Sequence, residues 1–185
     1  MGAWGPGLYS DDVTEDVRGI YVDKLHRGKN GEQASKEMIA EFEWACSDED
    51  DAPVFWFAMA DMQWNYGRLQ EEVKKKALYY LDDMKNLQRW EHENPKMAEK
   101  RKQVLNELRK KLNTLQPSEK KVSQYRLYHC QWKVGDMYAY QLEGEYAKER
   151  GLNGKYLLFY KIAESIWWPG HVIPVVYIKL TENNE

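Results

Sequence analysis

The most apolar run of the chain extends from Pro53 to Leu69. No residue between Val54 and Ala60 is polar, so a helix formed here has no face for water and must be buried. Pro53 suits the first turn of a helix, and Gly67 is typical of a C-terminal stop. We therefore predict a helix over residues 53–66 at the centre of a helical domain, with other helices packed around it.

Apolar residues recur at helical spacing on both sides of this run, which predicts helices over residues 12–27, 32–46, 70–81 and 95–115. Residues 82–94 remain ambiguous, because they can either extend the preceding helix or form a connector. The polar segment from Gln116 to Lys121 contains Pro117 and ends the helical pattern, so it is interpreted as a linker.

Beyond this segment the apolar period changes to two, which predicts strands over residues 124–128, 132–142, 155–163 and 172–180. Four or five short antiparallel strands favour an open barrel or a bent sheet. The predicted fold class is α+β: a helical domain of about five helices over residues 1–115, a linker over 116–121 and an antiparallel β domain over 122–185.

Charge is unevenly distributed along the chain. Residues 1–69 hold six Lys or Arg against fourteen Asp or Glu, whereas residues 70–121 hold fourteen against nine. The acidic part can face a basic partner, or it can be complemented by the basic middle of the chain. The last third has no charge excess, which disfavours a nucleic-acid partner. No run is long enough to span a membrane and no signal peptide is recognisable, so we expect a cytoplasmic protein with Cys46 and Cys130 as free thiols.

No common catalytic or phosphate-binding motif occurs in the chain. His129 and Cys130 are the only adjacent pair of soft metal ligands, and a zinc site would need two more ligands at suitable spacing. We therefore expect no metal, no cofactor and no catalytic residue.

Asp61 is the one carboxylate inside the apolar run, and a buried carboxylate must be paired or protonated. We expect a structural role in a polar cluster with Gln63, Arg68 and Arg18, in which Asp61 caps or bridges the glycine-rich N-terminal segment.

Two groups of residues are candidates for contact with a partner. Aromatic side chains are enriched at protein interfaces, which indicates Tyr128 and the turn residues Trp167 and Trp168 of the β domain. The acidic run before the central helix offers a charged alternative, and it consists of Asp48, Glu49, Asp50 and Asp51.

Two segments carry a resemblance to known families. The opening residues 1–5, Met-Gly-Ala-Trp-Gly, followed by Gly7 and Tyr9, resemble an uncharacterised bacterial family that begins Met-Gly-Ala/Thr-Trp-Gly, and the likeness extends over residues 1–121. Residues 132–140, Trp-Lys-Val-Gly-Asp-Met-Tyr-Ala-Tyr, resemble the opening of a small β domain found among bacterial immunity proteins. The first resemblance implies no activity. The second implies a protein-binding role.

Two functions from different classes follow. The first is a non-catalytic protein-binding module, such as an immunity protein or another antagonist of a bacterial or phage effector, whose partner is another protein. The second is an enzyme or small-ligand-binding protein with a site between the two domains, where Asp61, His129, Asp136 and His171 would converge.

Overall fold

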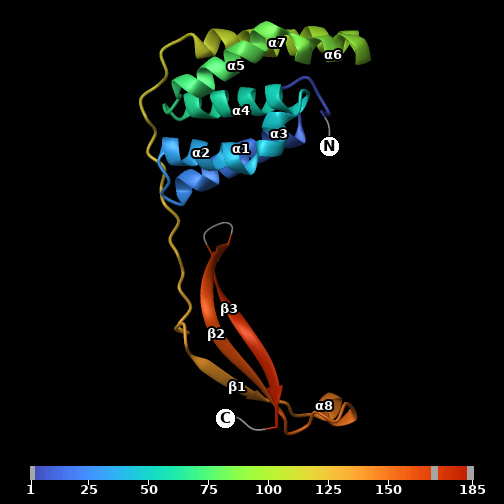
Figure 1. Ribbon diagram of the computed structural model, residues 1–185, viewed down its shortest axis with the longest axis vertical. Helices are drawn as coiled ribbons and strands as arrows, with labels where there is room; N and C mark the ends of the chain where they lie inside the picture. The colour runs from blue at the N-terminus through green and yellow to red at the C-terminus, as the bar shows by residue number, and fades with distance from the viewer. Residues whose placement is uncertain (1–2, 168–170, 183–185) are drawn as a thin grey trace. The chain divides into compact units, whose positions relative to one another are not determined.

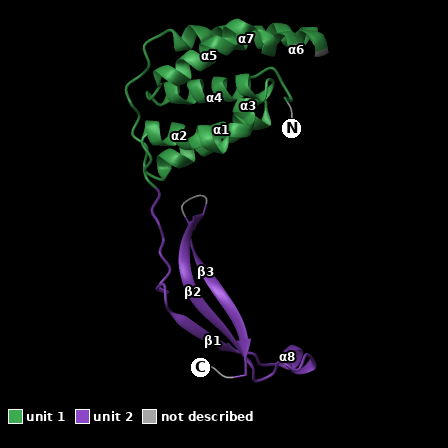
Figure 2. Ribbon diagram, viewed as in Figure 1, with its two compact units in different colours: residues 1–124 green, residues 125–185 purple. Residues whose placement is uncertain are grey.

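The computed structural model describes residues 3–167 and 171–182, and these form an α+β fold. They divide into two compact units, unit 1 over residues 1–124 and unit 2 over residues 125–185 (Figure 2). Among the described residues, unit 1 holds seven helices, and unit 2 holds a three-stranded antiparallel open sheet with one short helix (Figure 1).

Unit 1 is built around α4 (Asp51–Asn65), which confirms the predicted central helix. All residues from 52 to 63 are buried. The helix α1 (Asp12–His26) packs on one side of α4, and α5 (Glu71–Asp83) and α7 (Pro95–Leu112) pack on the other (Figure 1).

Local sequence signals explain where these helices begin. The Asp11 carboxylate caps α1 through the Val13 amide, and the Asn94 side chain caps α7, where Pro95 is the first residue. Within the ambiguous residues 82–94, the first two end α5, and a separate helix, α6 (Lys85–Glu93), follows after Met84 adopts a left-handed conformation with φ of 59°.

The predicted helix over residues 32–46 is wrong as a single element. It is divided into α2 (Gly31–Glu41) and α3 (Glu43–Ser47) at Phe42, whose backbone leaves helical geometry. The Phe42 side chain is buried against Phe55 and lies beside Trp44, with ring centroids 5.5 and 6.0 Å away. The break between α2 and α3 thus lies where the Phe42 ring packs against α4, and helical periodicity did not reveal it.

The end of α4 explains why the following segment stays with unit 1. Gly67 has φ of 67°, and the amides of Gly67 and Arg68 donate to the carbonyls of Trp64 and Gln63, which is a Schellman motif. A Cβ on Gly67 would lie 2.4 Å from the Pro117 carbonyl oxygen, so the chain passes directly over this glycine.

The segment expected as a linker, residues 116–121, is hydrogen-bonded to unit 1. The Gln116 side chain accepts from the Leu69 amide at 2.7 Å, and the Lys120 amide donates to the Tyr66 carbonyl at 3.0 Å. Arg68 adds a hydrogen bond to the Lys120 carbonyl and an ion pair with Glu119.

Unit 2 contains β1 (Met137–Gln141), β2 (Tyr156–Trp167) and β3 (His171–Thr181) in the order β1-β2-β3, all antiparallel. The strand expected over 124–128 is not formed, because the only ladder contact described there is an isolated bridge between Tyr128 and His171. The strand expected over 132–142 is reduced to β1, since a turn with Gly135 at φ of 98° precedes it. The loop after β1 contains an additional short helix, α8 (Glu145–Glu149).

Candidate functional site: two faces of the sheet in unit 2

The strand register assigns each side chain of the sheet to one of two faces. Met137 pairs with Tyr160, and Tyr160 pairs with Tyr177, so these three share one face. Val175 and Ile173 follow at alternate positions of β3, and Trp167 pairs with His171 on the same side. We call this the apolar face and define it by six exposed residues: Met137, Tyr160, Trp167, Ile173, Val175 and Tyr177.

The apolar face exposes much of three aromatic rings. The exposed fractions are 63 % for Trp167, 61 % for Tyr177 and 44 % for Tyr160. These three rings therefore expose roughly 300 Å², if a whole aromatic side chain contributes about 200 Å². Lys179 is the only Lys, Arg, Asp or Glu that the register places on this side among the described strands. The largest apolar patch of a typical monomer is about 300–600 Å² and is often functional.

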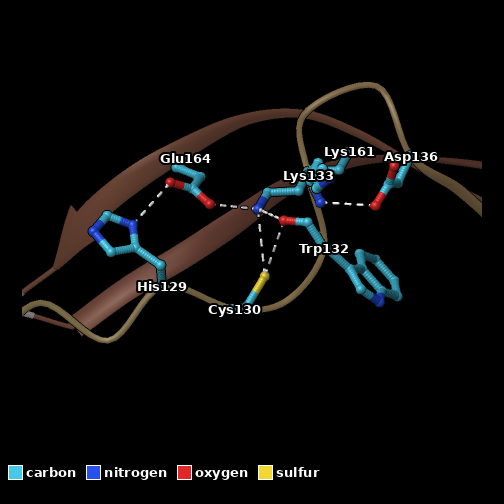
Figure 3. A network of polar contacts seen from close by, with 7 residues as sticks. All are labelled: His129, Cys130, Trp132, Lys133, Asp136, Lys161 and Glu164. Carbon is cyan, nitrogen blue, oxygen red and sulfur yellow. Dashed lines mark hydrogen bonds and ion pairs between the residues drawn. The ribbon is translucent and has the colours of Figure 1, made fainter.

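The opposite face is crossed by residues 129–135, which we call the strap, and a polar cluster lies beneath it (Figure 3). The Lys161 side chain is fully buried, and its ammonium donates to the Trp132 carbonyl and to Glu164 Oε1, each at 2.5 Å. It also donates to Cys130 Sγ at 3.3 Å, while His129 Nδ1 lies 3.4 Å from Glu164 Oε2. The strap is thus fastened to β2 through the Lys161 side chain, the contact of His129 with Glu164 and a backbone hydrogen bond from the Gly135 amide to the Lys161 carbonyl.

A β-bulge brings Lys161 and Glu164 to the same face. Residues three apart in a regular strand point to opposite faces. Here Lys161 pairs with Val176 and Ala163 with Val175, so one extra residue is inserted in β2. The contact with Glu164 raises the pKa of Lys161, and the hydrogen bonds from Lys161 and His129 lower the pKa of Glu164. Both groups are therefore held in their charged forms.

Sequence reasoning identified His129 and Cys130 but not Lys161 or Glu164. Lys161 stands in the otherwise apolar and aromatic run of residues 156–162, which was the only available signal. Its partner could not be deduced, because the bulge that aligns the two side chains has no clear mark in the sequence.

The predicted aromatic contacts lie in different places. Trp167 is on the apolar face at the end of β2. Tyr128 is 73 % exposed and precedes the strap, with its backbone bridged to His171. Trp168 lies outside the described residues.

The acidic run lies at the start of α4 in unit 1. Asp48 Oδ1 accepts from the amides of Asp50 and Asp51 at 2.8 and 3.0 Å, so Asp48 binds the backbone where the helix begins. Glu49 is exposed and lies 4.0 Å from Lys85. These acidic groups therefore have local structural partners.

The expected polar cluster is divided among separate contacts. Asp61 accepts hydrogen bonds from Tyr9 at 2.7 Å, Asn65 at 2.8 Å and Lys111 at 2.6 Å. Through Tyr9, Asp61 holds the N-terminal segment, and Arg18 lies over the Tyr9 ring.

The other two members of that expected cluster bind elsewhere in unit 1. Gln63 donates to Ser35 at 2.6 Å and accepts from the Gln70 amide, and Arg68 holds the segment around Glu119. Arg101 of α7 is buried and donates to the carbonyls of Pro6 and Gly7. It is a second anchor of the N-terminal segment.

The four residues of the enzyme hypothesis have local partners in their own units. Asp61 belongs to unit 1, whereas His129, Asp136 and His171 belong to unit 2. Asp136 accepts from the Lys133 amide at 2.8 Å and so closes the turn before β1. His129 contacts Glu164, and the His171 backbone is bridged to Tyr128.

Within the described part of the chain, no group of three or more His, Cys, Asp or Glu side chains is arranged to hold a metal ion. No described helix has the length and apolar character needed to cross a membrane. Comparison of the chain with family models, curated proteins and solved structures found no match.

Proposed function

We propose that this chain is a non-catalytic protein-binding protein and that the apolar face of unit 2 contacts its partner. The observation that carries the proposal is the exposure of three aromatic rings on one almost uncharged side of a sheet. A protein interface combines an apolar, aromatic centre with few charges, and Trp and Tyr dominate its binding energy. Trp167, Tyr160 and Tyr177 supply such a centre.

The small apolar core of unit 2 also supports a binding partner. Among its described residues, only three apolar side chains are buried: Ala147, Leu158 and Val172. A small sheet gains little stability unless one of its faces is covered. Covering the apolar face with another protein would add the burial that the unit lacks.

We further propose that the partner is an effector that this protein antagonises, as an immunity protein does. This finer proposal is based on the resemblance of residues 132–140 to the immunity-protein β domain. It predicts that the bound effector loses its activity when this chain is present in excess.

The test is affinity capture with the tagged full chain from a lysate of the source organism, compared with two matched variants. The first variant, Trp167→Ser with Tyr177→Ser, changes the apolar face. The second, Ile178→Ser with Leu180→Ser, removes two exposed apolar side chains from the other face of β3. Far-UV circular dichroism of both variants checks that the sheet is retained.

We expect one partner to be captured by the wild type and by the Ile178, Leu180 variant, but at least tenfold less by the Trp167, Tyr177 variant. Equal capture by all three would overturn the assignment of the surface. In that case Asp48→Asn with Glu49→Gln would test the acidic run next. Capture of no protein by any of them would count against a protein-binding function.

A further inference from the structure

We propose that Cys130 and Lys161 form a reversible covalent cross-link when unit 2 meets peroxide, which fixes the strap to β2. The observation is the contact of two nucleophilic atoms from segments 31 positions apart: Lys161 Nζ lies 3.3 Å from Cys130 Sγ. A bond between them requires the two atoms to move closer together.

The surroundings of the two atoms suit this chemistry. Cys130 is half-buried, so part of the residue is open to a small oxidant. The Lys161 side chain is fully buried, so its nitrogen is restricted to positions near the sulfur. Glu164 Oε1 lies 2.5 Å from that nitrogen. The charged pair is the resting state, and Glu164 takes up the proton of the ammonium only transiently, while the amine attacks.

The reaction balances in two steps. Hydrogen peroxide first oxidises the Cys130 thiol to a sulfenic acid and is itself reduced to water. The Lys161 ammonium then gives a proton to Glu164, and the free amine attacks sulfur. The S–O bond breaks, hydroxide leaves as water with the proton held by Glu164, and a second N–H proton passes to solvent. The product is a sulfenamide with one S–N bond, which an added thiol reduces back to the thiol and the amine.

The second cysteine is a natural control. Burial raises the pKa of Cys46 to about 11, which disfavours the reactive thiolate. No hydrogen bond joins Cys46 to an amine in the part of the chain that the structure describes. Cys46 can therefore oxidise without forming the same product.

The test uses the full chain with Cys46→Ser, which also removes any disulfide between the two cysteines. After treatment with a small excess of hydrogen peroxide, we expect the intact mass to fall by two hydrogen atoms, about 2 Da. Peptide mapping should join the segments that contain Cys130 and Lys161, and dithiothreitol should restore the original mass.

Two further chains make the outcome decisive. The double variant Cys46→Ser, Cys130→Ser and the double variant Cys46→Ser, Lys161→Met should both lack the loss of two hydrogens. Sulfinic acid at Cys130, or a disulfide between two molecules, without the mapped cross-link in Cys46→Ser would overturn the proposal. If Lys161→Met disturbs the sheet, the map of the Cys46→Ser chain decides alone. None of these results depends on the identity of a partner.

Discussion

The helix α4 and the strand β2 contain similar numbers of residues, but their surroundings differ. In α4, which has 15 residues, every residue from 52 to 63 is buried. In β2, which has 12 residues, only Leu158 and Lys161 are buried. Unit 1 therefore derives its stability from apolar packing around one helix. Unit 2 depends on strand pairing and on the polar contacts beneath the strap, and it exposes apolar side chains on its sheet. A surface that is left open in this way is available for binding.

The largest effect on this contrast between the units is expected when unit 1 is produced as a fragment without unit 2. A fragment of residues 1–124 should fold alone, with cooperative thermal unfolding followed by circular dichroism at 222 nm, because its core is complete. A fragment of residues 1–115 should be clearly less stable, since it lacks the segment that covers Gly67 and binds Arg68 and Leu69. Equal stability of the two fragments would mean that residues 116–124 contribute nothing to unit 1.

The next largest effect is expected from Phe57→Ala in the full chain. Phe57 is completely buried in α4, and removal of such a ring costs about 3–5 kcal/mol of unfolding free energy. The matched change Tyr177→Ala on the apolar face should cost no more than about 1 kcal/mol. Urea denaturation followed at 222 nm measures both. A similar loss for the two variants would contradict the contrast between the units.

Substitution of Gly67 should have an intermediate effect. Gly67→Ala forces a side chain into a left-handed conformation and against the carbonyl of Pro117, which should cost about 2–4 kcal/mol. Gly19→Ala is the control, because Gly19 lies within α1 with no atom near its added Cβ. It should stabilise unit 1 by about 0.5–1 kcal/mol. The two variants are thus expected to shift the urea midpoint in opposite directions.

The smallest expected effect appears at alkaline pH and concerns unit 1. Burial raises the pKa of Tyr21 to about 12, and burial together with Asp61 raises that of Tyr9. Because the folded pKa values lie above the unfolded value of about 10, this contribution to stability is complete below pH ~10 and is lost above it. Between pH ~10 and pH ~11, the ionisation of each tyrosine should lower the free energy of unfolding by about 1 kcal/mol.

Absorbance at 295 nm, which reports tyrosinate, should rise for these two residues together with the loss of helix. Comparison of the variant Tyr9→Phe with the wild type identifies how much of the alkaline loss of stability is due to Tyr9. If both tyrosines ionise in the folded chain well before the helices melt, the predicted coupling is wrong.

Local sequence patterns determined much of this fold. The apolar run at 54–60 required a buried helix, and α4 is that helix, because a segment without polar side chains has no stable place at the surface. Period-two patterns predicted the β2–β3 region, and helical spacing predicted that α7 begins at residue 95. In each case the sequence pattern lies within the element that it predicts or directly beside it.

Tertiary structure decided what depends on residues far apart. Phe42 divides a continuous helical pattern where its ring meets Phe55, and residues 116–120 bind the end of α4 although their composition is typical of a linker. The bulge in β2 places Lys161 and Glu164 on one face, where a regular strand would separate them. Periodicity describes how one segment repeats, whereas register, bulges and long-range hydrogen bonds depend on the partner segment. The apolar run therefore predicted the core of unit 1, while the two faces of unit 2 emerged only from the paired strands.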